Sequence, residues 1–227
     1  MSEIGGITAN HTGMTPEEIF TRAEVSPVRV ADAGAEAQII AKIDQCKQQG
    51  DTLGGVVEVV ATGLPPGLGS FAQWDRKLDG RLGQALLSLQ AVKGVEVGLG
   101  FATARLPGSQ VHDEIDFDPQ AGFLRRSNNS GGTEGGMSTG EPLRVRVAFK
   151  PLSTLMRPLR SVDINTKEAV EATIERSDVC AIPAAAVIAE SVVAFVLAQA
   201  FLEKFGGDSL VEIQRNYEGY LEQVRHF

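Results

Sequence analysis

The sequence predicts an α+β fold, because strand-like and helix-like patterns are interspersed along the chain. Residues 143–149 alternate apolar and polar side chains, which is the period of a half-buried strand. Residues 75–89 repeat apolar side chains every three or four positions, as a helix packed by one face does. Residues 183–204 are apolar almost throughout, which predicts a helix enclosed on every side. With 227 residues, 43% of them hydrophobic, the chain can build one large domain or two small ones.

The elements follow in order from these periods and from capping residues. They are a strand at 4–9, a helix from Pro16, a helix at 32–47, strands at 54–62 and 92–97 that flank the helix at 75–89, the strand at 143–149, the helix at 183–204 and a last helix from Leu210. Thr15 and Glu18 form a capping box around Pro16, which marks the first helix start. The last helix carries a second packing stripe, made by Leu210, Ile213, Tyr217, Leu221 and Val224.

The apolar helix at 183–204 has a second interpretation, because its length approaches that of a membrane span. Glu190 lies near its middle, and no basic anchor precedes it. We therefore favour a buried central helix.

Composition limits the classes of function. The formal net charge of -8 and pI near 5.0 disfavour a general nucleic-acid or membrane-surface binder, which needs a net basic face. Cys46 and Cys180 are far apart in a long chain and are expected to be reduced thiols, with Cys46 packed as a small apolar group. No His or Cys pair has metal-ligand spacing. The first residues lack a secretory leader pattern, so we expect a cytoplasmic protein.

A local reversal of charge predicts an anion site. Between Glu141 and Asp163 there is no acidic residue, although five basic ones occur there: Arg144, Arg146, Lys150, Arg157 and Arg160. A glycine-rich loop, residues 125–140, comes just before, and such loops let backbone N–H groups approach a phosphate or carboxylate. Two other interpretations stay open. The loop is a flexible connection, or the cationic strand is a charged edge that blocks aggregation.

Three further segments are candidates for the site. The turn from Lys150 to Thr154 offers an ammonium group, two hydroxyls and backbone donors, a set that suits phosphate. Asp178 is a candidate base or hydrogen-bond acceptor and Arg176 a candidate anion holder, but the two could equally form a structural ion pair. His112 lies among carboxylates, and we favour a capping or surface role for it.

Long ungapped segments from about residue 4 to residue 209 resemble the chorismate synthase family. They are GDTLGGVVEVVATGLPPGLGS, KLDGRLGQALLSLQAVKGVEVGLGF, GSQVHDEI, RRSNNSGGTEGGMSTGEP, FKPLSTLMRPLRSVD and ERSDVCAIPAAAVIAE. The resemblance implies a β-α-β sandwich with helices between antiparallel sheets. It also implies a lyase that converts 5-enolpyruvylshikimate 3-phosphate to chorismate by 1,4-elimination of phosphate, in aromatic amino acid biosynthesis. The family requires reduced FMN, is also associated with NADP, and usually forms homotetramers.

The resemblance implies roles for individual residues. The implied flavin contacts are Gln90, Ala91, Gly135, Lys150, Pro151, Leu152, Ser153, Thr154 and Arg176, and Asp178 would assist proton movement near the reactive flavin edge. Arg125, Arg126, Arg157 and Arg160 are expected to bind the phosphate and carboxylates of the substrate, on position and charge. No metal is implied.

The chain also departs from the family pattern. It contains no Gly-Glu-Ser-His-Gly motif and no Arg-Ser-Ser-Ala-Arg-Glu motif. Family members carry both motifs in their N-terminal part, along with two histidines that act as acids in the reaction. We therefore expect residues 1–227 to form a single chorismate synthase-like domain that lacks the family's N-terminal part. Two other functions stay open: a catalytically impaired flavin- or phosphate-binding fragment, and an unrelated nucleotide-phosphate binding module. We also expect the long helix to lack part of its cover, so that the chain exposes apolar surface and self-associates.

Overall fold

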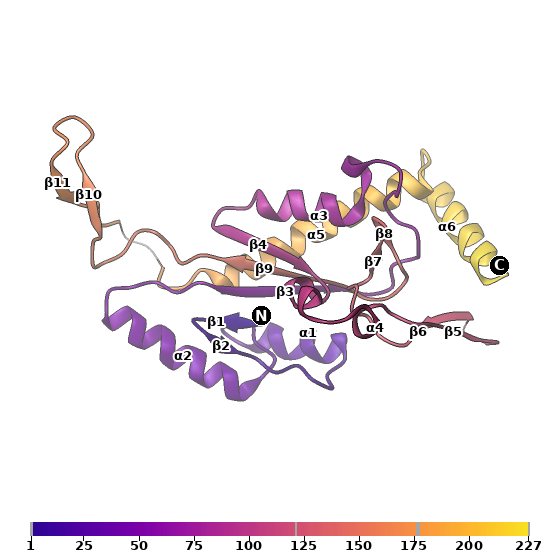
Figure 1. Ribbon diagram of the computed structural model, residues 1–227, viewed down its shortest axis with the longest axis horizontal. Coiled ribbons are helices and arrows are strands. Elements are labelled where there is room, and N and C mark those ends of the chain that lie inside the picture. The colour runs from indigo at the N-terminus through magenta and orange to yellow at the C-terminus, as the bar shows by residue number, and fades with distance from the viewer. Residues whose placement is uncertain (1, 121, 176–177, 227) are drawn as a thin grey trace. The chain divides into compact units, whose positions relative to one another are not determined.

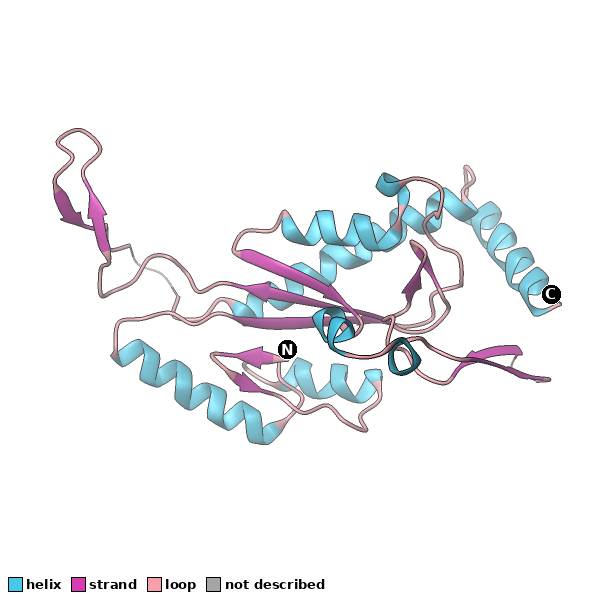
Figure 2. Cartoon of the chain, in the orientation of Figure 1, coloured by secondary structure: helices cyan, strands magenta, loops and turns pink. Residues whose placement is uncertain are grey.

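Helices and antiparallel strands are interspersed along the chain, as the α+β prediction requires (Figure 2). The computed structural model describes residues 2–120, 122–175 and 178–226. Over these ranges, five strands form one sheet in the order β2-β1-β3-β9-β4. Their bounds are Ile7–Thr8 for β2, Glu3–Ile4 for β1, Gly55–Ala61 for β3, Leu143–Phe149 for β9 and Val92–Val97 for β4.

The described chain divides into two compact units. Unit 1 comprises Met1–Glu58, Gln90–Gly94 and Val147–Ile188, and unit 2 comprises Val59–Leu89, Val95–Arg146 and Ala189–Phe227. Strands β3, β4 and β9 and helix α5 (Ile182–Phe205) each contribute residues to both units. The single domain expected over 1–227 stays a prediction.

Unit 1 begins with a tight hairpin where we predicted one strand over 4–9. Strands β1 and β2 pair antiparallel, with Ile4 opposite Ile7. Gly5 and Gly6 between them have φ of 57° and 85°, a left-handed backbone that glycine adopts without steric cost. The single-strand prediction was wrong because these two glycines reverse the chain after two residues of pairing.

Helices α1 (Pro16–Val25) and α2 (Ala33–Gln48) lie beside this hairpin in Figure 1. The predicted capping box of α1 is present, with Thr15 accepting from the Glu18 N–H and the Glu18 carboxylate accepting from the Thr15 N–H. Cys46 on α2 is 5% exposed, and burial raises the pKa of its thiol, so it packs as the expected small apolar group. The unit 1 core is Ile4, Val28, Val30, Ile39, Val57, Val147, Phe149 and Ile182.

In unit 2, the predicted helix over 75–89 appears as a 3-10 turn, η1 (Trp74–Arg76), followed by α3 (Leu78–Leu87). Its predicted stripe is confirmed, since Leu78, Leu82 and Leu86 are fully buried. These side chains belong to a core that also contains Val59, Leu68, Leu143, Val145, Val193, Val196 and Ala200. The apolar face of β9 is therefore buried throughout, as its alternation predicts.

The last helix, α6 (Leu210–Arg225), begins at Ser209, whose hydroxyl accepts from the Glu212 N–H. Tyr217 and Tyr220 pack against Phe205, at ring separations of 5.2 and 5.4 Å. The predicted packing stripe is wrong at Leu210, which is 82% exposed. Leu210 is the first residue of the helix, about two turns before the tyrosines that make the contact.

Several short elements escaped prediction because they are too short to show a period. They are η2 (Gly100–Arg105), α4 (Gly108–Val111), and the hairpins β5–β6 (Ile115–Asp118 with Gly122–Arg125), β7–β8 (Thr133–Glu134 with Met137–Ser138) and β10–β11 (Arg160–Val162 with Ala169–Glu171).

Helix α5 is not enclosed on every side, which corrects the prediction made from its composition. Phe195 is 65% exposed and Leu202 is 51% exposed, both within unit 2. By length and composition alone the helix could span a membrane, since its most apolar 18 residues have a mean hydropathy of 2.1. Of these residues, 39% are buried. A core helix of a soluble protein meets the same criterion. The expectation that the long helix lacks part of its cover is therefore confirmed for these side chains.

This exposed face leads to the first prediction. At micromolar concentration the chain should sediment as species larger than its 24.1 kDa monomer, because apolar patches associate. Replacing Phe195 and Leu202 by serine should shift the distribution toward monomer in analytical ultracentrifugation. The same substitutions at Leu78 and Leu82, which are fully buried, should instead unfold the protein. A monodisperse wild-type monomer that unfolds cooperatively in calorimetry would contradict the prediction.

Candidate functional site

The segment between α2 and β3 holds two of the predicted site segments in place in unit 1. The hydroxyl of Thr52 donates to the carbonyl of Leu152, with an Oγ1–O distance of 2.6 Å. The next backbone N–H, of Leu53, donates to the carbonyl of Val179 at 2.8 Å. Thr52 and Leu53 therefore hold the predicted flavin-binding turn and the segment that follows Asp178 by one hydrogen bond each.

Close packing of backbone adds to this arrangement. A Cβ atom at Gly54 would lie 2.5 Å from the carbonyl oxygen of Phe149 and 2.9 Å from Cδ of Pro151. Only glycine lets β3 begin this close to the start of the turn. One position before Asp51, the Gly50 carbonyl accepts from the backbone N–H of Arg157 at 3.0 Å.

Of the predicted flavin contacts Gln90 and Ala91, the second is bonded to the same turn. The carbonyl of Ala91 accepts from the backbone N–H of Lys150 at 2.8 Å. Ala91 has a φ of 68°, a left-handed conformation that residues with a Cβ seldom adopt. Such backbone strain is concentrated at functional sites, where the surrounding structure holds it in place.

The turn from Lys150 to Thr154 presents its polar groups to solvent. The side chains of Lys150 and Ser153 are exposed, while those of Leu152 and Thr154 are partly covered. Pro151 has no N–H and fixes its own φ, which limits the conformations of the turn. Asp178 is also exposed, beside the fastened Val179. Arg176, the other predicted residue of that motif, lies outside the described residues.

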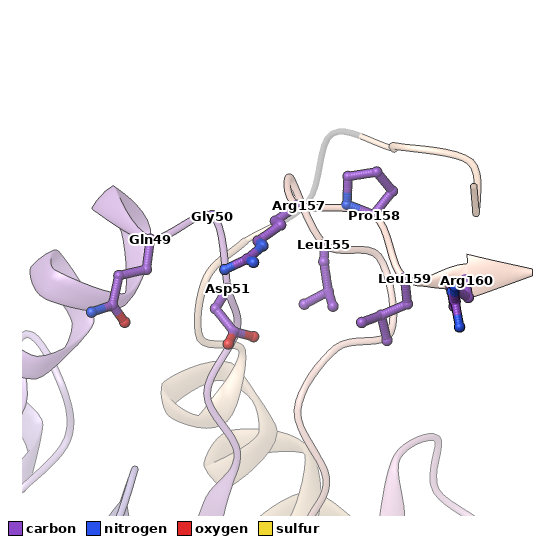
Figure 3. Close-up of a pocket in the computed structure, with 8 residues that line it drawn as sticks. All are labelled: Gln49, Gly50, Asp51, Leu155, Arg157, Pro158, Leu159 and Arg160. Carbon is purple, nitrogen blue, oxygen red and sulfur yellow. The ribbon is translucent and has the colours of Figure 1, made fainter.

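Two of the predicted substrate-binding arginines line one pocket of unit 1, of about 560 Å³ (Figure 3). Its walls are Gln49, Gly50, Asp51, Leu155, Arg157, Pro158, Leu159 and Arg160. Figure 3 shows the Arg157 side chain extending toward the Gly50–Asp51 backbone. One Asp51 carboxylate oxygen accepts from the Thr52 N–H at 2.8 Å. The pocket is therefore lined by two arginines and by Asp51, whose carboxylate is already hydrogen-bonded.

The other two predicted arginines lie in unit 2 and are paired with carboxylates. Arg125 forms a two-point ion pair with Glu134, at 3.0 and 2.9 Å. Arg126 bonds both oxygens of Asp116, at 2.6 and 2.9 Å, and a second carboxylate, that of Glu114, at 3.0 Å. An anionic substrate would have to exchange with these partners. The remaining predicted residue, Gly135, is exposed in the β7–β8 turn of unit 2, with open space where a Cβ would stand.

The cationic strand is also neutralised in part. Arg146 on β9 forms an ion pair with Glu96 on β4 at 2.5 Å. The two residues are separated by fifty positions, so the sequence pattern around Arg146 contained no sign of this partner. The positive charge of the segment is thus concentrated toward Lys150, Arg157 and Arg160.

A residue that the sequence reasoning missed is Asp113, which organises the glycine-rich loop of unit 2. Asp113 is 8% exposed, and its carboxylate accepts from the Ser127 hydroxyl at 2.5 Å and from the N–H groups of Asn129 and Ser130 at 2.7 and 2.9 Å. Burial raises the pKa of Asp113, but these hydrogen bonds outweigh it and lower the pKa to about 2. The neighbouring His112 is exposed and follows α4 as its C-cap residue, as the surface interpretation predicts.

The structure therefore groups most of the predicted residues within unit 1. These are Gln90, Ala91, Lys150, Pro151, Leu152, Ser153, Thr154, Arg157, Arg160 and Asp178. The sequence offered one sign that Thr52 and Asp113 matter, because each lies inside a segment that resembles the family. Their partners, however, are distant in sequence.

Comparisons with known proteins show which family the chain is similar to. The sequence model described as "Chorismate synthase" matches residues 1–202. The chorismate synthase of Geobacter metallireducens is 59% identical over 232 residues, which cover 99% of this chain and 59% of the relative. That of Symbiobacterium thermophilum is 62% identical over 212 residues, which cover 93% of this chain and 54% of the relative.

A solved structure is similar as well. The crystal structure titled "Crystal Structure of Chorismate Synthase" superposes with a TM-score of 0.80 at 44% sequence identity, covering 94% of this chain and 57% of that one. The chain spans about three fifths of the length of the curated relatives it matches. Both the sequence and the fold thus place this chain in the chorismate synthase family.

Proposed function

We propose that this chain acts in the conversion of 5-enolpyruvylshikimate 3-phosphate to chorismate and phosphate, with reduced FMN, in aromatic amino acid biosynthesis. The observation that carries the proposal is that Thr52 and Leu53 bond the Lys150–Thr154 turn and the segment after Asp178, while Ala91 bonds the same turn at Lys150. The chain covers about three fifths of its relatives, so the activity of the whole relatives is a proposal for this chain.

The residues present fit a flavin mononucleotide. Its phosphate needs cationic and hydroxyl donors, and Lys150 and Ser153 supply these on the exposed side of the turn. Gln90 is exposed next to Ala91 and offers an amide to the polar edge of the ring system. When bound and reduced, FMN supplies the electron density that the elimination requires.

The residues of unit 1 also fit the substrate, which carries a phosphate and two carboxylates. The guanidinium groups of Arg157 and Arg160 would hold these anions by charge-assisted hydrogen bonds. Asp178 would hold or move a proton beside the bound ring, because a carboxylate can accept and return one. We further propose a cytoplasmic homotetramer and an association with NADP, and the exposed apolar face of α5 supports association between copies.

The deciding experiment is an anaerobic assay with reduced FMN and 5-enolpyruvylshikimate 3-phosphate, in which chorismate is measured by absorbance. Turnover supports the proposal. Quenching of flavin fluorescence without turnover supports the alternative, a flavin- or phosphate-binding fragment with impaired catalysis. Protection by ATP against thermal unfolding, with neither flavin binding nor turnover, would favour a nucleotide-phosphate binding module instead.

The substrate part of the proposal has its own test. Arg160→Ala should weaken binding of 5-enolpyruvylshikimate 3-phosphate about tenfold, because one charge-assisted hydrogen bond is lost. FMN binding should change much less. Arg105→Ala, at an exposed arginine of unit 2, is the matched control and should leave both affinities unchanged. Equal weakening of FMN and substrate, or no weakening in either titration, would refute the division of roles.

A further inference from the structure

We propose that Thr52 is a positioning residue for the flavin-binding turn, acting through the carbonyl of Leu152. The inference rests on the proposed function, because it assigns Thr52 the task of presenting the turn to the FMN phosphate. The sequence around Thr52 gives no sign of its partner, which lies 100 positions away.

The contact is short and partly buried. Thr52 is 8% exposed, and its Oγ1 lies 2.6 Å from the Leu152 oxygen, near the short end for O–H···O hydrogen bonds. A bond shielded from solvent is stronger than an exposed one, and its loss leaves a carbonyl without a partner. Thr52 therefore fixes the direction in which the Leu152 carbonyl points.

The direction of that carbonyl determines where the turn presents its next donor. In a planar trans peptide, the C=O of one residue and the N–H of the next point in opposite directions. Because the Leu152 carbonyl points toward Thr52, the Ser153 N–H points away from it. The Ser153 side chain is exposed on the turn, so this N–H and the Ser153 hydroxyl are held ready for an anion.

The neighbouring contacts leave the turn little other freedom. The Lys150 N–H is held by the Ala91 carbonyl at 2.8 Å, and Pro151 has a fixed φ. Leu152, held by Thr52, is thus the second fixed point of the turn, two residues after Lys150. Leu53, bonded to the Val179 carbonyl at 2.8 Å, extends the same support to the segment of Asp178. The pair Thr52–Leu53 sets the turn and the carboxylate relative to each other within unit 1.

Thr52→Val tests the role, because it keeps the shape of the side chain and removes the hydroxyl. Thr52→Ser keeps the hydroxyl and removes the methyl group. The matched control is Thr103→Val in unit 2, where a threonine hydroxyl also donates to a backbone carbonyl, that of Gly100 at 2.7 Å. Thermal unfolding of all three variants separates global destabilisation from local effects.

The first readout is hydrogen–deuterium exchange of the flavin-free protein. Thr52→Val should speed amide exchange in peptides that cover 150–157 about tenfold, a ratio that corresponds to about 1.4 kcal/mol, near the net value of one hydrogen bond. In these peptides the N–H groups of Lys150 and Arg157 are protected by the carbonyls of Ala91 and Gly50. Thr52→Ser and Thr103→Val should leave exchange there as in the wild type. A general speeding across unit 1 in Thr52→Val, with no excess at 150–157, would overturn the inference.

The second readout is a fluorescence titration with FMN. Thr52→Val should raise the dissociation constant for FMN about tenfold, and Thr52→Ser should restore wild-type affinity. Wild-type affinity in Thr52→Val, or an equal loss in Thr52→Ser, would show that the hydroxyl does not position the turn. If the wild-type protein does not bind FMN at all, the proposed function fails, while the exchange measurement still decides whether Thr52 orients the turn.

Discussion

Replacing Gly54 by alanine should lower the free energy of unfolding by about 3 kcal/mol, at the upper end of the usual cost of overpacking. A Cβ there would lie 2.5 Å from the Phe149 carbonyl oxygen and 2.9 Å from Cδ of Pro151. Both contacts are with backbone or with a proline ring, which cannot rotate away. The start of β3 and the flavin-binding turn would have to separate.

The separation should also reach the site, because the Thr52 hydroxyl bonds Leu152 only while these two segments stay close. We therefore expect Gly54→Ala to weaken FMN binding as well as stability, measured by urea unfolding and by flavin fluorescence. Gly94→Ala is the matched control. Gly94 lies in β4, and an added Cβ would meet the Ala148 Cβ at an ordinary 3.6 Å. That variant should be as stable as the wild type or slightly more so. Equal stability of the two variants would contradict the close packing described at Gly54.

Removing the carboxylate of Asp113 should have a comparable effect in unit 2. Asp113→Ala should cost about 3 kcal/mol, because it leaves a hydroxyl and two backbone N–H groups without their acceptor. The glycine-rich loop that follows Ser127 should then lose its order. Urea unfolding measures the first effect, and proteolysis within the loop measures the second.

The low pKa of Asp113 also predicts a dependence of stability on pH. Its pKa is lowered from 3.8 to about 2 on folding, so the folded state binds this proton less readily than the unfolded state. The contribution of about 2 kcal/mol is fully present above pH 4 and is lost as the pH falls through about 2.

Asp113→Asn should remove most of this acid sensitivity, because asparagine does not titrate. Asp75→Asn, at an exposed aspartate of the same unit, is the control and should leave the pH profile as in the wild type. If Asp113→Asn retained the full wild-type loss of stability between pH 5 and pH 2, the carboxylate would not be the group responsible.

Much of the secondary structure was predictable because its causes are local. The capping box of Thr15 and Glu18 requires residues only three positions apart, and the buried stripe of α3 depends on its own period. The strand at β9 follows in the same way from alternation. The prediction failed at residues 4–9, where two glycines reverse the chain, and on α5, where uniform apolarity concealed an exposed face.

Membership of the family was also predictable, since long segments such as those containing Lys150–Thr154 and Asp178 resemble it directly. What those segments could not reveal is how they are held. Thr52 bonds Leu152 across 100 positions, and Asp113 bonds Ser127, Asn129 and Ser130 across 14 to 17 positions. Neither spacing matches a helix, a strand or a turn.

The sequence by itself thus determined the class of fold, the positions of the longer helices and strands, and the residue types that suit a flavin and an anionic substrate. These properties depend on the chemistry of each residue and on neighbours within a few positions. The tertiary structure alone decided which cations are paired, as with Arg125, Arg126 and Arg146, and which stay exposed, as with Lys150. It also decided that Thr52 and Gly54 support the turn. Contacts of this kind form when distant segments pack together, and they leave no periodic trace in the chain.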